Sequence, residues 1–142
     1  MGAERNAIDR VHRYLPREMH KESMTGAFQN GRPDYYYDGP RSDLWVEWKT
    51  GELYYENGTV LVEFEATTLQ QKWIARRSEY GGNVVTFVAL PDKTIVCTLS
   101  PKSWQLVRTN QKKKRHVFRA PVVATFTAQE VARWIASFCS GA

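Results

Sequence analysis

Apolar and polar residues alternate from Val46 to Lys49, and the whole stretch 44–49 is rich in aromatic and β-branched residues and lacks Gly and Pro, which predicts a β-strand. Successive side chains of a strand point to opposite faces. Glu47 and Lys49 therefore share one face, and the other face is apolar, with Leu44, Val46 and Trp48. Residues 34–37 predict a second strand that is entered from a turn at 31–33 rich in Gly and Pro. Pairing of the two strands would bring Asp34 close to Glu47.

Spacing and turn residues predict the elements around these strands. Ile8, Val11 and Leu15 recur at helical spacing and predict a helix over 4–15, which Pro16 ends. Asn57-Gly58 predicts a type I′ hairpin between strands at 52–56 and 59–66, because both residues accept a positive φ. The other expected elements are an extended segment at 21–31, a helix at 67–80, a strand buried on both faces at 83–90 and a strand at 94–99.

The C-terminal third predicts a helix, an edge strand and a last helix. Ser100-Pro101 is typical of a helix start and predicts a short helix to about residue 107. Pro121 lies near the start of a strand-like stretch at 118–125, which we expect at a sheet edge. Thr127-x-x-Glu130 is a capping box for a final helix with a wide apolar face. Together the elements predict an α/β fold, a mixed central β-sheet flanked by helices.

Composition indicates one globular domain. The chain has 142 residues, of which 42% are hydrophobic and 25% charged, as in ordinary soluble proteins. No apolar run approaches the roughly 18 residues of a membrane-spanning helix, and the charged N-terminus lacks a signal-like apolar core. We therefore expect a cytoplasmic protein without membrane contact. The net charge of +5 favours acidic partners, nucleic acid first.

Asp34, Glu47 and Lys49 are candidates for metal-dependent phosphodiester hydrolysis. Magnesium prefers oxygen ligands and is commonly held by one or two carboxylates together with waters and substrate phosphate. Asp34, Glu47 and the Trp48 backbone carbonyl would supply the protein ligands, and Lys49 would orient the attacking water. The alternative interpretation is a solvent-facing Glu/Lys pair and an Asp that serves a turn.

Other carboxylates compete for a supporting role. Glu4 lies on the apolar face of the first predicted helix, four residues before Ile8, although a carboxylate in a first turn also complements the helix dipole. Glu18 and Glu22 are alternatives to Glu4. Glu63 and Glu65 would add carboxylates near the metal or remain solvated on their strand.

Basic residues form two groups that we expect to contact DNA phosphates. Lys72, Arg76 and Arg77 lie along the helix predicted at 67–80, and Lys72 and Arg76 are one helical turn apart. The second group follows the short helix: Arg108, Lys112, Lys113, Lys114 and Arg115. Such charge runs are also typical of solvated loops, but sequence-independent affinity for DNA comes from groups of this kind.

The order of these motifs resembles the PD-(D/E)xK nuclease superfamily, and within it the stand-alone VRR-NUC branch of bacteria and their viruses. The resemblance rests on Asp34 after Gly-Arg-Pro, on Glu47-Trp48-Lys49, and on a glutamine-led helix before Gly81-Gly82. It covers about residues 4–90. It implies a restriction-endonuclease-like fold, with residues 117–140 completing the fold or forming a dimer interface.

The resemblance also implies roles for individual residues. Asp34 and Glu47 match the metal-binding carboxylates, Lys49 matches the catalytic lysine, and Glu4 matches the acidic residue of the first helix. Gln71 matches the glutamine after the motif, with Gln70 one residue away as the alternative. The segment 50–66 is inserted relative to the family pattern, and this insertion bears most on the glutamine assignment.

The resemblance implies a homodimeric endodeoxyribonuclease that depends on Mg²⁺, for which Mn²⁺ would substitute. Stand-alone members tend to act on branched DNA such as four-way junctions, so we expect a structure-selective enzyme in a bacterial or phage-infected cell. The alternatives are a site-specific endonuclease of restriction or homing type, a non-catalytic nucleic-acid-binding protein, and a nuclease fold that serves in protein–protein interaction.

Overall fold

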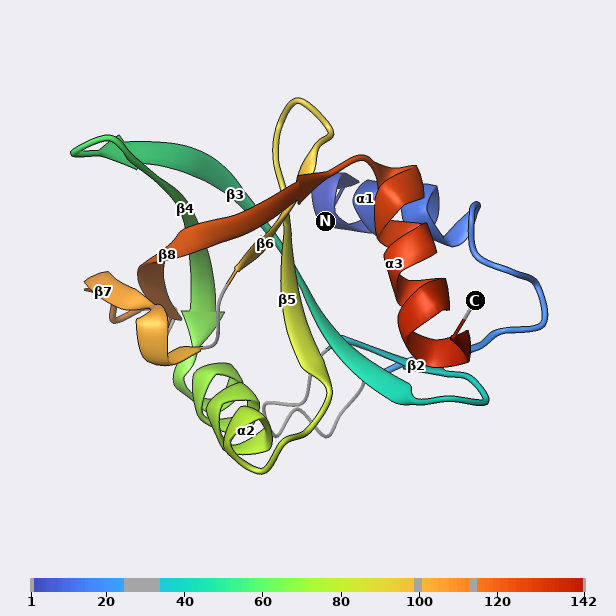
Figure 1. Cartoon of the computed structure of the whole chain (residues 1–142). Helices are drawn as coiled ribbons and strands as arrows, with labels where there is room; N and C mark the ends of the chain where they lie inside the picture. Colours follow the sequence, from blue (N-terminus) through green and yellow to red (C-terminus); the bar gives the residue numbers. More distant parts are fainter. Residues whose placement is uncertain (1, 25–33, 99–100, 113–114, 142) are drawn as a thin grey trace.

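Helices cover both faces of a mixed β-sheet (Figure 1). The computed structural model describes residues 2–24, 34–98, 101–112 and 115–141. These residues form three α-helices, α1 (Gly2–His12), α2 (Thr68–Glu79) and α3 (Ala128–Ser140), and a 3-10 turn, η1 (Pro101–Ser103). The strands that they form are β1 (His20–Ser23), β2 (Tyr35–Asp38), β3 (Asp43–Glu56), β4 (Thr59–Thr67), β5 (Val84–Ala89), β6 (Ile95–Thr98), β7 (Gln105–Asn110) and β8 (Arg115–Phe126).

The sheet is organised by two long strands, β3 and β8, that each change partners along their length. Strand order is β1-β2-β3-β4-β8-β6-β5, and β5 also pairs with β3. The β3–β5 pairing is parallel, and the other pairings are antiparallel. The predicted mixed sheet flanked by helices is therefore confirmed. Because β5 pairs with β3, the five strands β3, β4, β8, β6 and β5 form a closed ring of pairings.

Two apolar cores lie on opposite faces of β3. On one face α1 and α3 pack on Val46 and Trp48 through residues such as Ile8 and Ile135. On the other face Ile74 of α2 packs with a second cluster that includes Val62, Phe64, Val88 and Phe118. Leu44, Val46 and Trp48 thus share the apolar face of β3 that strand alternation predicted. Among the described residues, the helices are too short or too polar to cross a bilayer.

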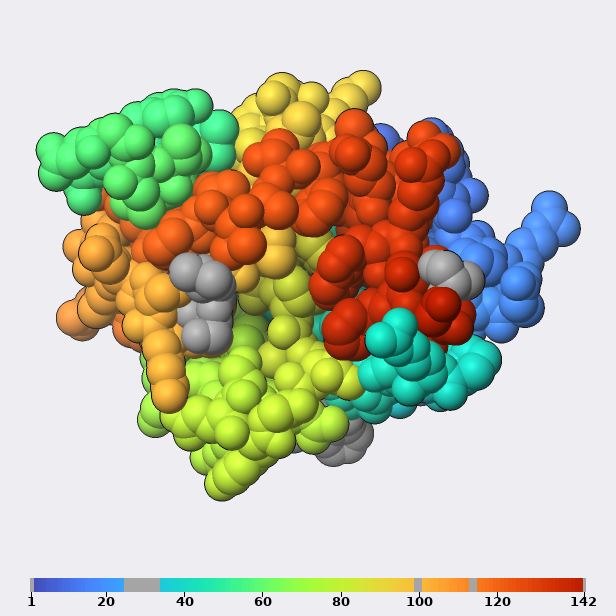
Figure 2. Space-filling view, viewed as in Figure 1, coloured from blue at the N-terminus to red at the C-terminus, as the bar shows by residue number. Residues whose placement is uncertain are grey.

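The Asn57-Gly58 hairpin forms as predicted and connects β3 to β4. Asn57 and Gly58 have φ of 51° and 78°, the left-handed conformation that a type I′ turn requires. Glu56 pairs with Thr59 across this turn. In Figure 2 the tip of this hairpin, in green, projects from the body of the molecule. The insertion expected at 50–66 is therefore an extension of the sheet.

Several predicted elements differ from the structure. The helix predicted to about residue 107 is limited to η1, and residues 105–110 form β7 because they pair with β8. The edge strand predicted at 118–125 belongs to β8, which pairs with β4, β6 and β7 and is interior. Pro121 is tolerated where β8 passes from β4 to β6. The first helix ends at His12 rather than at residue 15.

Gly51 lies where β3 leaves β5 and joins β4, and this position requires the absence of a side chain. A Cβ atom there would lie 2.2 Å from the Glu63 carbonyl oxygen and 2.9 Å from Val88 Cγ1. The first of these atoms belongs to backbone and yields only if the two strands separate. We expect Gly51→Ala to lower the free energy of unfolding by about 2 kcal/mol.

Urea denaturation would measure this loss, with Gly2→Ala as the matched control. No atom lies within 4 Å of a Cβ built on Gly2, which opens α1, so this variant should be as stable as the wild type or slightly more stable. Equal stability of the two variants would contradict the close approach of β3 and β4.

Candidate active site

The candidate site lies where β3 changes its neighbour. β2 pairs with β3 as far as Val46, and β4 pairs with it from Gly51 onward. In the described pairings the residues between them, Glu47 to Thr50, pair with β5 alone. One edge of β3 therefore exposes backbone groups to side chains instead of to another strand.

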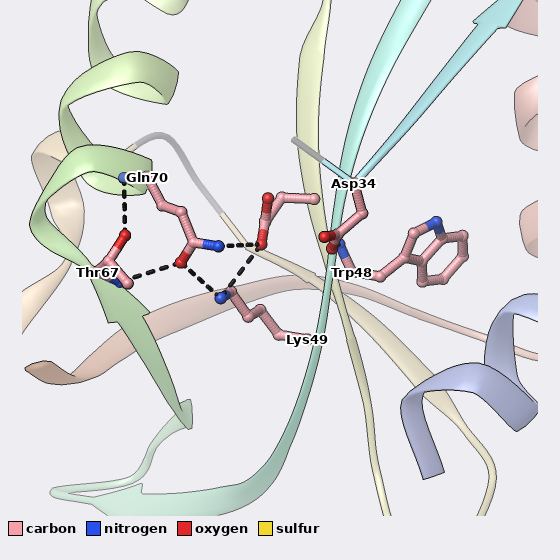
Figure 3. Close-up of polar contacts among 6 residues, drawn as sticks. Asp34, Trp48, Lys49, Thr67 and Gln70 are labelled. Atoms are coloured by element: carbon pink, nitrogen blue, oxygen red, sulfur yellow. Dashed lines mark hydrogen bonds and ion pairs between the residues drawn. The ribbon is translucent and has the colours of Figure 1, made fainter. Parts of the chain in front are cut away.

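Asp34 occupies this edge immediately before β2 begins. Its Oδ2 accepts a hydrogen bond of 2.9 Å from the Trp48 backbone N–H, and Figure 3 shows the two residues side by side. The N–H and C=O of one strand residue point to the same edge. The Trp48 carbonyl therefore also faces the gap between β2 and β4 at this edge of β3, which we call the opening. Burial raises the pKa of Asp34, while the Trp48 N–H and the Lys49 ammonium lower it.

Glu47 and Lys49 form a buried ion pair on the face of β3 that α2 covers. Lys49 Nζ lies 3.1 Å from Glu47 Oε2, and the two residues are 1% and 6% exposed. Burial raises the pKa of Glu47 to about 8; the nearby Asp34 carboxylate adds to this effect and Lys49 opposes it. The second oxygen, Glu47 Oε1, is buried and has no hydrogen-bond partner among the described residues.

Gln70 joins the ion pair to the start of α2 (Figure 3). Its Oε1 accepts hydrogen bonds from Lys49 Nζ (2.8 Å) and from the Thr67 backbone N–H (3.0 Å), and its Nε2 donates to Glu47 Oε2 (3.2 Å). Because a backbone N–H can only donate, the Thr67 contact fixes which end of the amide faces Lys49. Thr67 and Gln70 also form the capping box that begins α2.

The structure distinguishes the two candidate glutamines by their contacts. The sequence favoured Gln71, but Gln70 is the residue whose side chain reaches Glu47 and Lys49. The physical reason is the helix phase. Thr67 rather than Thr68 is the N-cap, and the capping box places the side chain of its third residue, Gln70, back toward the end of β4.

Glu4 lines the outer side of the same opening. Its pKa is raised by burial and by the Asp34 carboxylate, and Lys49 lowers it, so its carboxyl lies within electrostatic reach of both. The alternatives, Glu18 and Glu22, are both exposed. Glu22 lies on β1, with its Oε2 3.6 Å from His20 Nε2. Of the three candidates, Glu4 is the one that the fold brings to Asp34 and Lys49.

A cleft of about 310 Å³ continues from Glu4 and Lys49 across the sheet. It is lined also by Thr50, Glu65 and Val117, and by Glu63, Phe64, Arg108 and Arg115. Glu63 lies between two arginines, with Oε1 at 3.1 Å from Arg119 Nε and Oε2 at 3.7 Å from Arg108 Nη2. Sequence reasoning missed Arg119 as a partner. The signal is its register opposite Glu63, which becomes visible only when β4 is paired with β8.

The two predicted basic groups lie in different places. Lys72, Arg76 and Arg77 are exposed on α2, with the Arg77 guanidinium 5.8 Å from the ring of Trp73. Arg108 and Arg115 line the cleft, and Lys112 is exposed between them at the β7–β8 turn. Lys113, Lys114 and the turn residues 31–33 lie outside the described part of the chain.

The residues present fit a hard divalent cation. Asp34 and Glu47 offer carboxylates at one opening, and the unpaired Glu47 Oε1 is a buried oxygen that a cation would satisfy. Burial raises the pKa values of Asp34, Glu47 and Glu4, so a cation close to them would stabilise their charged forms. The described residues contain no group of three or more His, Cys, Asp or Glu side chains arranged as a metal site, so a cation here would have these two carboxylates as its side-chain ligands.

Comparison with known proteins identifies the fold. No protein-family model matches the chain, and no curated protein matches it in sequence. Among solved structures, the chain is similar to Hjc, a Holliday junction resolvase from the archaeal hyperthermophile Archaeoglobus fulgidus, with a TM-score of 0.53. The match covers 92% of this chain and 97% of that chain at 16% sequence identity. The restriction-endonuclease-like fold expected from the sequence is therefore confirmed.

Burial of Glu47 predicts a pH-dependent cost to the metal-free protein. The folded-state pKa is about 8 against an ordinary value of 4.5. Below the lower value the carboxyl is protonated in both states. Between the two values the folded state keeps a proton that the unfolded state has released, so the free energy of unfolding falls as the pH rises from about 4.5 and reaches its low level once the pH passes about 8 and the buried carboxylate is charged. Glutamine does not titrate, so the melting temperature of Glu47→Gln should exceed that of the wild type by several degrees at pH 9.

Thermal unfolding in EDTA at pH 5 and pH 9 measures this effect. The two proteins should melt at similar temperatures at pH 5, where Glu47 is protonated in the folded state. A difference that is the same at both pH values would show that the Glu47 carboxyl is not the group responsible.

Proposed function

We propose that this protein is a divalent-metal-dependent endodeoxyribonuclease that selects branched DNA. The observation that carries the proposal is the buried, unpaired Glu47 Oε1 next to Asp34, with the Lys49 ammonium on the same carboxylate. A polar atom left in this state normally costs about 1–3 kcal/mol. Such a cost is typical of a site built for a ligand rather than for stability.

Asp34, Glu47 and the Trp48 carbonyl would hold Mg²⁺, for which Mn²⁺ would substitute. The bound ion would lower the pKa of a water and neutralise charge that grows on the phosphate oxygens. Lys49 would donate hydrogen bonds to the attacking water or to a phosphate oxygen. Gln70 accepts from one Lys49 N–H and keeps the ammonium aimed at the opening, while Glu4 adds negative charge at its outer rim.

Branched DNA is the substrate class that the fold comparison and the sequence resemblance both favour. The similar structure is described as a Holliday junction resolvase, and the sequence resembles the VRR-NUC branch, whose stand-alone bacterial and phage members tend to be dimers. We therefore include a homodimer in the proposal, because two symmetric active sites suit paired nicks in a symmetric substrate. The proposed setting is the cytoplasm of a bacterial or phage-infected cell.

A panel of DNA substrates tests both the metal dependence and the preference for branched DNA. Linear duplex, single strand, flap and four-way junction would be incubated with the protein in Mg²⁺ and in EDTA. We expect Mg²⁺-dependent cleavage with preference for the junction. Lys49→Met keeps the buried methylene packing and removes the ammonium, so it should fold and bind DNA while cleavage falls by about 100-fold or more.

The exposed Lys102→Met serves as control, because Lys102 lies on η1 and is 71% exposed at its side chain. Cleavage by the Lys49 variant at the wild-type rate would refute the mechanism. Junction binding without Mg²⁺-dependent cleavage by the wild-type protein would instead support a non-catalytic DNA-binding protein. Cleavage at one sequence in every duplex would support a site-specific endonuclease.

Adjacent glutamines provide a matched pair for the positioning role of Gln70. Gln70→Ala removes the acceptor of Lys49 and the donor to Glu47, so we expect kcat to fall by about 10-fold or more with little change in KM. Gln71→Ala changes the same residue type one position later and should cut at nearly the wild-type rate. The opposite ranking of the two variants would restore the assignment made from sequence.

A further inference from the structure

The cleft next to the candidate active site has an acidic and a basic end. Glu4 and Lys49 line one end, and Arg108 of β7 and Arg115 of β8 line the other. The positive charges of Lys49 and Arg115 both lower the pKa of Glu4. The two ends of the cleft therefore lie within electrostatic reach of each other. A DNA strand that enters the active site would continue along this cleft, because backbone phosphates on either side of the cleaved bond must also be accommodated.

The three arginines near Glu63 differ in how firmly they are held. Arg119 is fixed, since its guanidinium lies 3.6 Å from the centre of the Tyr54 ring, its Nε is 3.1 Å from Glu63 Oε1, and its side chain is 21% exposed. Arg108 is held more loosely, since its side chain is 62% exposed and its Nη2 lies 3.7 Å from Glu63 Oε2. Arg115 is exposed and has no ion pair recorded among the described residues. Two of the three are therefore available to a ligand in the cleft.

We propose that Arg108 and Arg115 bind backbone phosphates next to the cleaved bond, and that Glu63 competes with DNA for Arg108. This inference rests on the proposed nuclease function and names how its site takes the substrate strand. Glu63 is well placed to compete because one oxygen is anchored on Arg119 while the other faces Arg108. A phosphate that reaches Arg108 must displace a carboxylate whose position is already fixed.

Competition of this kind would limit indiscriminate binding. The cleft is lined by Glu4, Glu63 and Glu65 against Lys49, Arg108 and Arg115, so its formal charges balance although the whole chain carries +5. Sequence-independent affinity for DNA comes from unpaired cations and is lost when they are neutralised. A balanced cleft therefore favours DNA that also makes contacts elsewhere, as a branched substrate does, over a plain duplex.

The test is a double-mutant cycle on DNA binding measured by fluorescence anisotropy in EDTA. The variants are Glu63→Gln, Arg108→Ala, the double variant and Arg115→Ala. Arg133→Ala on α3 is the control, since it removes the same charge from an exposed position outside the cleft. Labelled duplex and four-way junction of equal length would be titrated over a range of salt concentrations.

We expect E63Q to bind duplex about 5-fold more tightly than the wild type, and R108A and R115A to bind about 5-fold more weakly. Each arginine variant should also lose about one unit of the slope of log affinity against log salt. The double variant should bind like R108A, because the benefit of removing Glu63 passes through Arg108. R133A should stay within about 2-fold of the wild type.

Two results with E63Q would overturn the proposal. One is unchanged or weaker binding by E63Q, and the other is a gain from E63Q that persists in the R108A background. Arg108 is exposed, so R108A alone tests the phosphate contact even where E63Q is unstable. Wild-type affinity and salt slope in R108A would also overturn it. Because binding is measured without metal, a failed nuclease proposal would appear separately, as absence of Mg²⁺-dependent cleavage by the wild type.

Discussion

The site depends on the burial of one carboxylate and one ammonium on the same face of a single strand. Taking Glu47 and Lys49 out of water costs free energy that their mutual attraction only partly returns. Gln70 satisfies part of each group, yet Glu47 Oε1 keeps no partner among the described residues. The rest of the chain stabilises an arrangement that is unfavourable by itself, which is what a preorganised ligand site requires.

The fold creates this arrangement by letting β3 change its partner. Along β3, the pairing with β2 stops at Val46 and the pairing with β4 starts at Gly51, while β5 holds the other edge of the strand between them. Asp34 fills the gap by accepting from the Trp48 N–H. On the other face of the strand, the indole N–H of Trp48 donates to the Tyr37 hydroxyl group, which also contacts His12. Packing by α1 and α3 thus fixes the strand that α2 covers from the opposite side.

Sequence patterns predicted the parts of the site that depend on local geometry. Strand alternation placed Glu47 with Lys49, and Asn57-Gly58 fixed the hairpin. The sequence left Gln71 and Gln70 as alternatives, and the position of the N-cap at Thr67 decides which glutamine reaches the ion pair. Long-range pairing was beyond local rules: β7 is a strand only because β8 lies beside it, and β8 is interior despite Pro121. Glu63 and Arg119 meet for the same reason.

Diffraction from crystals soaked in Mn²⁺, recorded at a wavelength where manganese scatters anomalously, tests the central claim most directly. The account predicts an anomalous peak at the opening of β3, at the coordination distance of about 2.1 Å from Glu47 Oε1 and from an Asp34 carboxylate oxygen. The same crystals of the Glu47→Gln variant should lack the peak. An ion bound elsewhere, or the wild-type opening without a peak at saturating Mn²⁺, would contradict the account.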